Sequence, residues 1–147
     1  MAVGRRPLGC DTVIGTRPEA IKLAPVIKAL RDEPSEFRVR VVTSGQHGEI
    51  CRSALAAFGI AANIALDAET IGSSPAASVG ELVRAFGHHI AQSHPDLLLV
   101  QGDTTTTMAA ALAGSCAQRS TAATGPKRRA GRSQYVAARI SACSAVA

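Results

Sequence analysis

Residues 11–30 read DTVIGTRPEAIKLAPVIKAL, and the spacing of the apolar side chains changes partway along this stretch. Val13 and Ile14 form a short apolar pair, as at the end of a β-strand. After Pro18, apolar residues recur every three to four positions through about Arg31, which is typical of an amphipathic helix. A helix tolerates proline in its first turn, so Pro18 marks the helix start. The stretch therefore predicts a strand, a tight turn and a helix in succession.

Further strands and helices follow in the same alternating order. Valines at 39, 41 and 42 favour a strand, and four consecutive apolar residues at 97–100 are typical of a strand buried on both faces of a parallel sheet. The predicted elements are a strand over 37–43, a helix over 49–58, an irregular segment over 60–75, a helix over 76–93, a strand over 97–100 and a helix over 104–117. This order predicts an α/β fold with a partial, doubly wound parallel sheet of about three strands.

The charge of the 147-residue chain is unevenly distributed. Of the net +5, residues 1–118 contribute −1, from ten Lys/Arg and eleven Asp/Glu, and residues 119–147 contribute +6, from six Lys/Arg and no acid. A basic tail can contact nucleic acid or an anionic membrane, but this one also lacks a hydrophobic period. We predict one incomplete domain over 1–118 and a disordered or irregular tail over 119–147, with at most a short helix near 134–142 and no nucleic-acid partner.

The cysteines and the chain start point to an ordinary cytoplasmic protein. Cys10, Cys51, Cys116 and Cys143 are widely spaced, with no CxxC pair and no histidine at zinc-finger spacing, which indicates neither a disulfide framework nor a metal site. The first residues lack the apolar core of a signal peptide, and no apolar run approaches the roughly 18 residues of a membrane span. We therefore predict a cytoplasmic location and no membrane contact.

Three polar clusters each follow a predicted strand directly. They are GTRPE at 15–19, SGQH at 44–47 and GDTTTT at 102–107. Because the carboxyl ends of parallel strands line one crevice, where such folds bind ligands, we expect these three clusters to lie close together.

The first cluster places a cation at a strand-to-helix turn. Helix N-terminal amides favour anions, and a guanidinium pairs well with phosphate, so Arg17 is a candidate for binding a phosphate or diphosphate. Lys22 could add a second positive charge to the same region. The alternative for both residues is an ordinary solvated surface side chain.

The other two clusters contain the candidate acid–base groups. Asp103 could act in catalysis, or it could simply cap the helix that follows. Threonines are poor residues for a helix interior, so the run that starts at Thr104 could instead offer hydroxyls and amides to a ligand. His47 follows a strand and could contact substrate. The three remaining histidines, at 88, 89 and 94, are predicted to face solvent.

Three segments carry a resemblance to a known family. GTRPEAIKLAPVIKAL at 15–30, TSGQH at 43–47 and PDLLLVQGDTTTTMAAALA at 95–113 are similar to the N-terminal domain of the non-hydrolysing UDP-N-acetylglucosamine 2-epimerases. The resemblance runs from about Thr12 to Gln118. It implies the Rossmann-like N-terminal half of a GT-B-type architecture, in which the active site lies in the cleft between two halves.

The resemblance also implies a reaction. These enzymes interconvert UDP-GlcNAc and UDP-ManNAc without metal or nicotinamide, and they are expected to be homodimers. The proton at C2 is removed while UDP leaves C1, and both return with the opposite configuration at C2. By resemblance, Asp103 matches an acidic active-site residue, Arg17 and Lys22 match basic residues of the nucleotide and active-site region, and His47 matches the histidine of the TSGQH turn.

The sequence departs from the family pattern in two places. Asp11 stands where the first strand is expected to be apolar, and residues 119–147 contain no Glu, Asp or His where segments resembling HVEAGLRTG and PEE would supply catalytic glutamates. We therefore expect a truncated or frameshifted family member that is inactive alone. The alternative is a non-catalytic half-domain that binds a sugar nucleotide or a separately encoded C-terminal partner.

Overall fold

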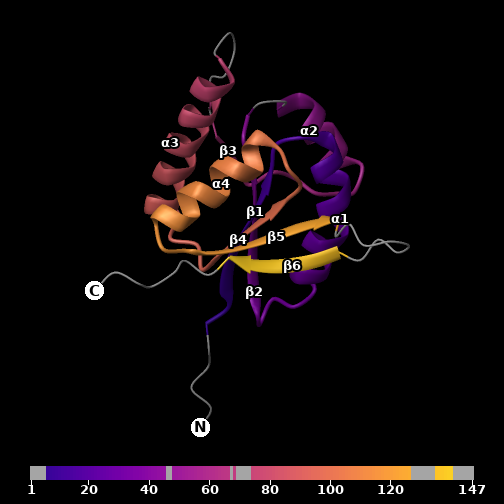
Figure 1. Cartoon of the computed structure of the whole chain (residues 1–147). Helices are drawn as coiled ribbons and strands as arrows, with labels where there is room; N and C mark the ends of the chain where they lie inside the picture. The colour runs from indigo at the N-terminus through magenta and orange to yellow at the C-terminus, as the bar shows by residue number, and fades with distance from the viewer. Residues whose placement is uncertain (1–5, 46–47, 67, 69–73, 127–134, 141–147) are drawn as a thin grey trace.

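Helices and strands alternate along the computed structural model of the chain, which describes residues 6–45, 48–66, 68, 74–126 and 135–140 (Figure 1). The elements are β1 (Leu8–Ile14), α1 (Arg17–Arg31), β2 (Phe37–Thr43), α2 (Gly48–Ala56), β3 (Ile64–Ala65), α3 (Pro75–Ser93), β4 (Leu97–Gln101), α4 (Thr105–Cys116), β5 (Ser120–Pro126) and β6 (Tyr135–Ile140). The fold is α/β, as the sequence predicts. In the described ranges, no helix combines the length and apolarity needed to cross a membrane.

The strands form one sheet in the order β3-β2-β1-β4-β5-β6. The first five run parallel, and β6 is antiparallel to β5. From β1 the chain moves outward through β2 to β3, then crosses back to β4 on the other side of β1. This reversal places the carboxyl ends of β1 and β4 side by side, which is where doubly wound sheets bind ligands.

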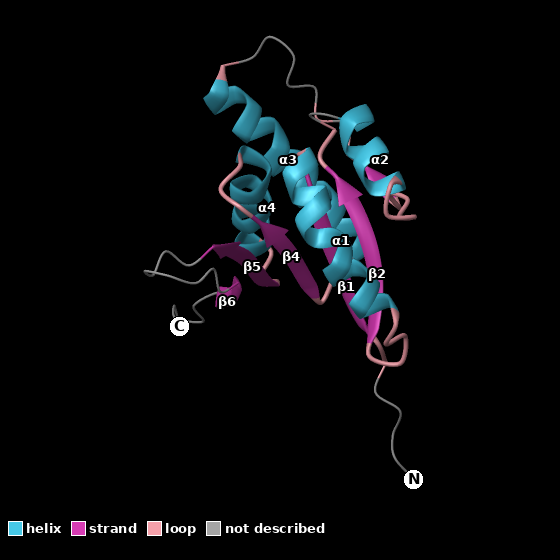
Figure 2. Ribbon diagram, turned by 90° about the vertical axis from the view of Figure 1, so that its right-hand side faces the viewer, coloured by secondary structure: helices cyan, strands magenta, loops and turns pink. Residues whose placement is uncertain are grey.

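The four helices cover both faces of the sheet (Figure 2). Ile14 packs beneath α1 and α2 with Leu23 and Leu55, whereas Val13 packs beneath α3 and α4 with Phe86. Successive strand residues point to opposite faces of a sheet. The apolar pair at the end of β1 therefore serves both layers of the core, and this holds the end of β1 in a defined position.

The core elements match the sequence predictions closely. The strand over 37–43 is confirmed as β2, and the four predicted helices begin and end within two residues of α1 to α4. The first strand is longer than the apolar pair indicated, because Leu8–Ile14 pairs along its whole length with β2. The prediction that residues 60–75 contain no regular element is wrong at β3, whose two residues pair with Val42 and Thr43 and are too few to show a pattern.

The region after Gln118 differs most from expectation. Ser120–Pro126 pairs in parallel with β4, and Tyr135–Ile140 pairs with β5, so the short helix predicted near 134–142 is wrong and the sheet has six strands in the described residues. Pairing at an open sheet edge uses backbone groups, so the small, weakly patterned side chains of β5 gave no periodic signal. Residues 127–134 and 141–147 lie outside the described residues, and the domain boundary at 118 stays a prediction.

Candidate active site

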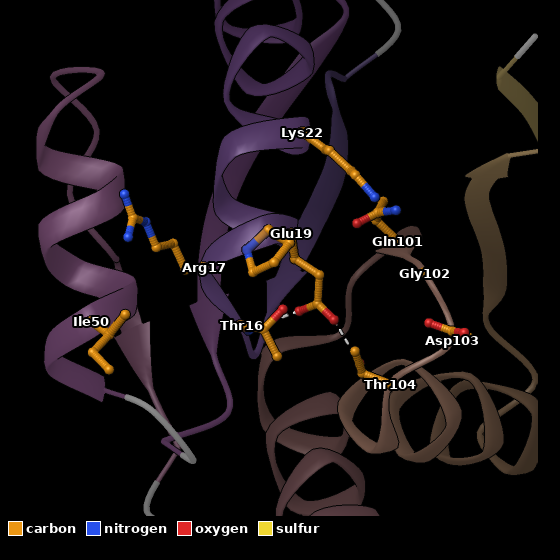
Figure 3. A pocket seen from close by; sticks show the side chains of 10 residues that line it. Thr16, Arg17, Glu19, Lys22, Ile50, Gln101, Gly102, Asp103 and Thr104 are labelled. Atoms are coloured by element: carbon orange, nitrogen blue, oxygen red, sulfur yellow. Dashed lines mark hydrogen bonds between the residues drawn. The ribbon is translucent and has the colours of Figure 1, made fainter. Parts of the chain in front are cut away.

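A pocket of about 490 Å³ opens where β1 and β4 end (Figure 3). One wall comes from the turn after β1 and the first turns of α1, the other from the turn between β4 and α4, and Ile50 of α2 adds an apolar side. The lining side chains that bear on the chemistry are Thr16, Arg17, Glu19, Lys22, Gln101, Asp103 and Thr104. Two of the three polar clusters thus meet at the switch point of the sheet.

Three of the four candidate residues line this pocket. Arg17, Lys22 and Asp103 are all exposed. Arg17 and Lys22 lie in the first turns of α1, and Asp103 lies in the β4–α4 turn, far away in the sequence. Figure 3 shows Lys22 extending toward Gln101, Arg17 pointing toward α2, and Asp103 across from the start of α1. Arg17 also lines a second hollow of about 380 Å³ against α2. His47 lies outside the described residues, so its placement stays a prediction.

Glu19 is a pocket residue that the sequence reasoning did not single out. Its side chain is buried, with a relative exposure of 2%. One carboxylate oxygen, Oε2, accepts hydrogen bonds from the backbone N–H groups of Gly15 at 2.6 Å and Thr16 at 3.0 Å. The other, Oε1, accepts from the Thr104 hydroxyl at 2.6 Å. The T-x-x-E spacing from Thr16, a capping-box signature, is the signal that could have identified Glu19.

The threonine run stabilises the start of α4 rather than offering all its hydroxyls to a ligand. Thr104 is the N-cap and accepts a hydrogen bond from the Thr107 N–H at 3.2 Å, so the alternative that Asp103 caps this helix is wrong. The Thr107 hydroxyl donates to the Gln101 carbonyl at 2.7 Å. The Thr106 hydroxyl donates to the Ser44 hydroxyl at 3.1 Å. Because Thr104 caps α4, the Asp103 carboxylate at the pocket is not the cap of this helix.

Close packing holds the turn after β1 against its neighbours. A Cβ on Gly15 would lie 2.6 Å from the Cβ of Thr106, so only glycine lets the β1–α1 turn approach α4 this closely. The Cys51 thiol of α2 donates to the Gly15 carbonyl at 3.3 Å. Burial raises the pKa of Cys51, and the nearby Glu19 carboxylate raises it further, so the thiol stays protonated and keeps this role.

The floor of the pocket carries an unpaired amide. Gln101, the last residue of β4, is 2% exposed, and its Nε2 atom has no hydrogen-bond partner among the described residues. A buried donor without a partner is costly, so this amide is a candidate to pair with a ligand oxygen. Within the same described part of the chain, no group of three His, Cys, Asp or Glu side chains could hold a metal ion.

The family model for UDP-N-acetylglucosamine 2-epimerase matches residues 28–122. This chain belongs to the UDP-N-acetylglucosamine 2-epimerase family. Its similarity to the epimerase of Yersinia pestis is 39% identity over 103 residues, which covers 70% of this chain and 27% of that protein. Its similarity to the epimerase of Escherichia coli strain K12 is 38% over 102 residues, covering 69% and 27%.

A solved structure of the family has the same fold over the matched part. The crystal structure of the UDP-GlcNAc 2-epimerase from Neisseria meningitidis, described as bound to UDP-GlcNAc, superposes with a TM-score of 0.74 at 34% identity. The match covers 79% of this chain and 32% of that one. This chain therefore spans about a quarter to a third of the length of these relatives.

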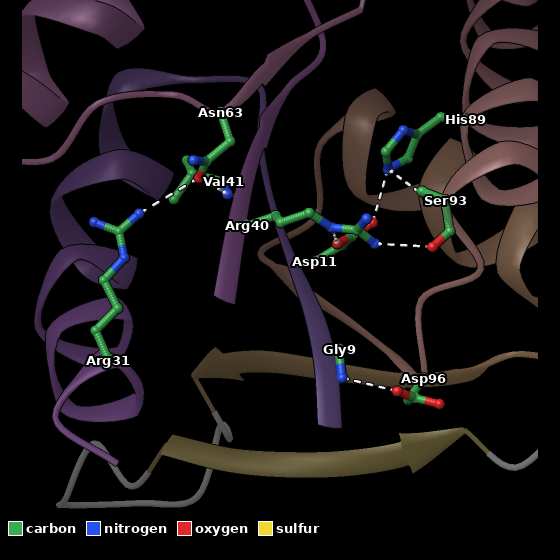
Figure 4. Close-up of polar contacts among 9 residues, drawn as sticks. All are labelled: Gly9, Asp11, Arg31, Arg40, Val41, Asn63, His89, Ser93 and Asp96. Carbon is green, nitrogen blue, oxygen red and sulfur yellow. Dashed lines mark hydrogen bonds and ion pairs between the residues drawn. The ribbon is translucent and has the colours of Figure 1, made fainter. Parts of the chain in front are cut away.

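Asp11, the departure from the apolar pattern of β1, is the centre of a buried polar network (Figure 4). It has no exposed surface. Arg40 donates from Nε to Oδ1 at 2.6 Å, and the His89 Nε2 lies 2.7 Å from Oδ2. The prediction that His89 faces solvent is wrong, because it follows Phe86 by three positions and so shares the buried face of α3. His88 and His94 are exposed, as predicted.

Proposed function

We propose that this chain supplies one side of a UDP-sugar site, and that its inherited activity is the interconversion of UDP-GlcNAc and UDP-ManNAc. The observation that carries the proposal is that Arg17, Lys22 and Asp103 line a single pocket at the switch point, although the first and last are 86 positions apart. The family membership and the UDP-GlcNAc-bound relative from Neisseria meningitidis support the choice of substrate.

The proposed roles follow from the charges at the pocket. The diphosphate carries negative charge that Arg17 and Lys22 can neutralise, the guanidinium with paired hydrogen bonds and the ammonium as a point charge. The C2 proton is weakly acidic and needs a positioned base, for which Asp103 is the exposed carboxylate of the pocket. When the base removes the C2 proton, the electron pair of the C2–H bond forms the C1–C2 double bond of a glycal. UDP leaves with the electron pair of the C1–O bond.

We further propose that the 147-residue chain does not epimerise alone. Return of the proton to the opposite face of C2 needs a second acid–base group. The other carboxylate of the pocket, Glu19, is committed to three hydrogen bonds. The sequence contains no acidic residue after Asp103. Among the described pocket residues, no second uncommitted carboxylate remains, so we propose that the second group comes from outside this chain.

The alternative function is binding without turnover, either of a sugar nucleotide or of a separately encoded C-terminal partner. It is favoured by the fact that Arg17, Lys22 and Asp103 already line one pocket in this chain. The expected cytoplasmic location, the homodimeric state expected of family members and the lack of a metal or nicotinamide requirement stay predictions. Light scattering of the purified chain tests the homodimer directly.

The test is a titration of the purified chain with UDP and UDP-GlcNAc, monitored by NMR, together with an assay for UDP-ManNAc. We expect weak binding. Arg17→Gln should reduce the affinity about fivefold or more, because one charge-assisted hydrogen bond is lost. Arg84→Gln, which removes an exposed cation on α3, is the matched control and should leave binding unchanged. Binding that survives both Arg17→Gln and Lys22→Gln would contradict the proposed site. Formation of UDP-ManNAc at ordinary enzyme rates would contradict the proposed inactivity.

A further inference from the structure

Glu19 occupies the amide-lined start of α1. In most helices, the first N–H groups are unpaired within the helix and favour an anion. Here the anion is internal, because the carboxylate accepts from the N–H groups of both Gly15 and Thr16. A ligand phosphate cannot use those two donors while Glu19 is in place. Arg17 and Lys22 are the cations that line this side of the pocket and can meet the charge of a ligand.

The same carboxylate joins the two walls of the pocket. The Thr104 hydroxyl donates to Glu19 at 2.6 Å and accepts from the Thr107 N–H at 3.2 Å, so one chain of hydrogen bonds runs from the start of α1 to the first turn of α4. Glu19 and Thr104 are 85 positions apart in the sequence. Figure 3 shows this contact crossing between the two helix starts.

We propose that Glu19 is a positioning residue, an internal anion that holds the β1–α1 and β4–α4 turns at the spacing that a UDP-sugar requires; the identity of the ligand rests on the proposed function. The Glu19 carboxylate is bonded to Gly15, Thr16 and Thr104. It acts by keeping Arg17 and Lys22 on one wall at a defined distance from Asp103 on the other. A helix cap of purely local importance would stabilise α1 but would leave α4 unaffected.

The first experiment measures amide hydrogen exchange by NMR in the whole 147-residue chain. The variants are Glu19→Ala, Thr104→Val and Thr104→Ser, with Glu81→Ala on the exposed face of α3 as control. We expect Glu19→Ala to accelerate exchange at Thr107 about fivefold, the factor for one hydrogen bond, although Thr107 is in the other wall. Formate at constant ionic strength should fill the space left by the carboxylate and reverse the effect.

Thr104 provides the reciprocal test and does not depend on whether Glu19→Ala folds. Thr104→Val should accelerate exchange at Gly15 and Thr16, because their shared acceptor loses its third partner, whereas Thr104→Ser keeps the hydroxyl and should behave as wild type. Glu81→Ala should change none of these amides. Exchange changes confined to the turn that carries each substitution would overturn the proposal.

A titration with UDP separates this proposal from the proposed function. If Glu19 positions the walls, Glu19→Ala and Thr104→Val should each weaken UDP binding about fivefold, with Arg17, Lys22 and Asp103 intact, and formate should restore binding to Glu19→Ala only. Wild-type affinity in both variants would overturn the positioning role. If the unaltered chain binds no UDP but exchange is coupled across the walls, the proposed function fails and the link through Glu19 stands.

Discussion

At the scale of single residues, three ionisable side chains meet in one contact between β1, β2 and α3, and two of them are buried. Asp11 is fully buried, Arg40 retains about a quarter of its side-chain exposure, and His89 is 7% exposed. A buried carboxylate is tolerated only if its oxygens are paired. Each Asp11 oxygen has one such partner. The network therefore replaces the apolar packing expected at this position of β1 and ties α3 to the centre of the sheet.

Replacing Arg40 with methionine should destabilise the chain by about 3 kcal/mol, because the buried Asp11 carboxylate loses its cation. Arg84→Met is the matched control, since Arg84 and Glu81 form an exposed pair on α3, and it should cost less than about 1 kcal/mol. Urea unfolding followed by circular dichroism measures both. Equal effects of the two substitutions would show that the Asp11 network does not stabilise the fold.

At the scale of elements, the contact between the β1–α1 turn and α4 sets the shape of the pocket. Gly15 and Thr106 touch where these elements meet, and the Thr106 hydroxyl bonds to Ser44 after β2. The three polar turns are thereby held together by packing as well as by the shared edge of the sheet. The clustering of these turns was predictable from strand order, but the use of the threonines as packing and capping residues was not.

Gly15→Ala should destabilise the chain by about 1–3 kcal/mol, because the added methyl group forces the turn away from Thr106. Gly87→Ala is the control within α3, where an added Cβ meets no atom within 4 Å. It should stabilise the helix by about 0.5–1 kcal/mol, since alanine is the better helix former. Chemical unfolding of both variants checks the difference in sign. A stable Gly15→Ala variant would mean that the turn can move away from α4 at little cost.

At the scale of the whole molecule, an ion pair near the chain start joins two neighbouring strands. Asp96, just before β4, accepts from Arg6 at 2.6 and 2.8 Å and from the Gly9 N–H of β1 at 2.8 Å (Figure 4 shows the Gly9 bond). The Arg6 guanidinium and then the Gly9 N–H hold the pKa of Asp96 at about 2. The pKa of aspartate in an unfolded chain is about 3.9. Asp96 therefore stabilises the fold above about pH 4, and this contribution is lost as the pH falls toward 2.

Removing this carboxylate should make the free energy of unfolding depend less on pH at acid pH. Between about pH 5 and 2, Asp96→Asn should lose less stability than the unaltered chain, because it no longer takes up a proton on unfolding. Arg6→Gln keeps the carboxylate but removes its main partner, so it should flatten the same window. Urea midpoints measured across this pH range test both variants. An unchanged acid slope in both would contradict the role assigned to Asp96.

The sequence by itself determined the α/β order, the bounds of β2, the bounds of α3 and β4 to within one residue, the family, and the meeting of Arg17, Lys22 and Asp103 at one pocket. The family follows from the resemblance of three segments, and the rest follows from local periodicity and from the rule that parallel strands end at a common edge, which need no knowledge of contacts. Only the tertiary structure decided that β5 and β6 extend the sheet, that His89 is buried on Asp11, and that Glu19 and Thr104 bond across the pocket. The physical reason is that edge pairing, the partner of a buried charge and hydrogen bonds between distant turns depend on which groups meet in space. Local spacing places His89 on the buried face of α3 but does not name its partner.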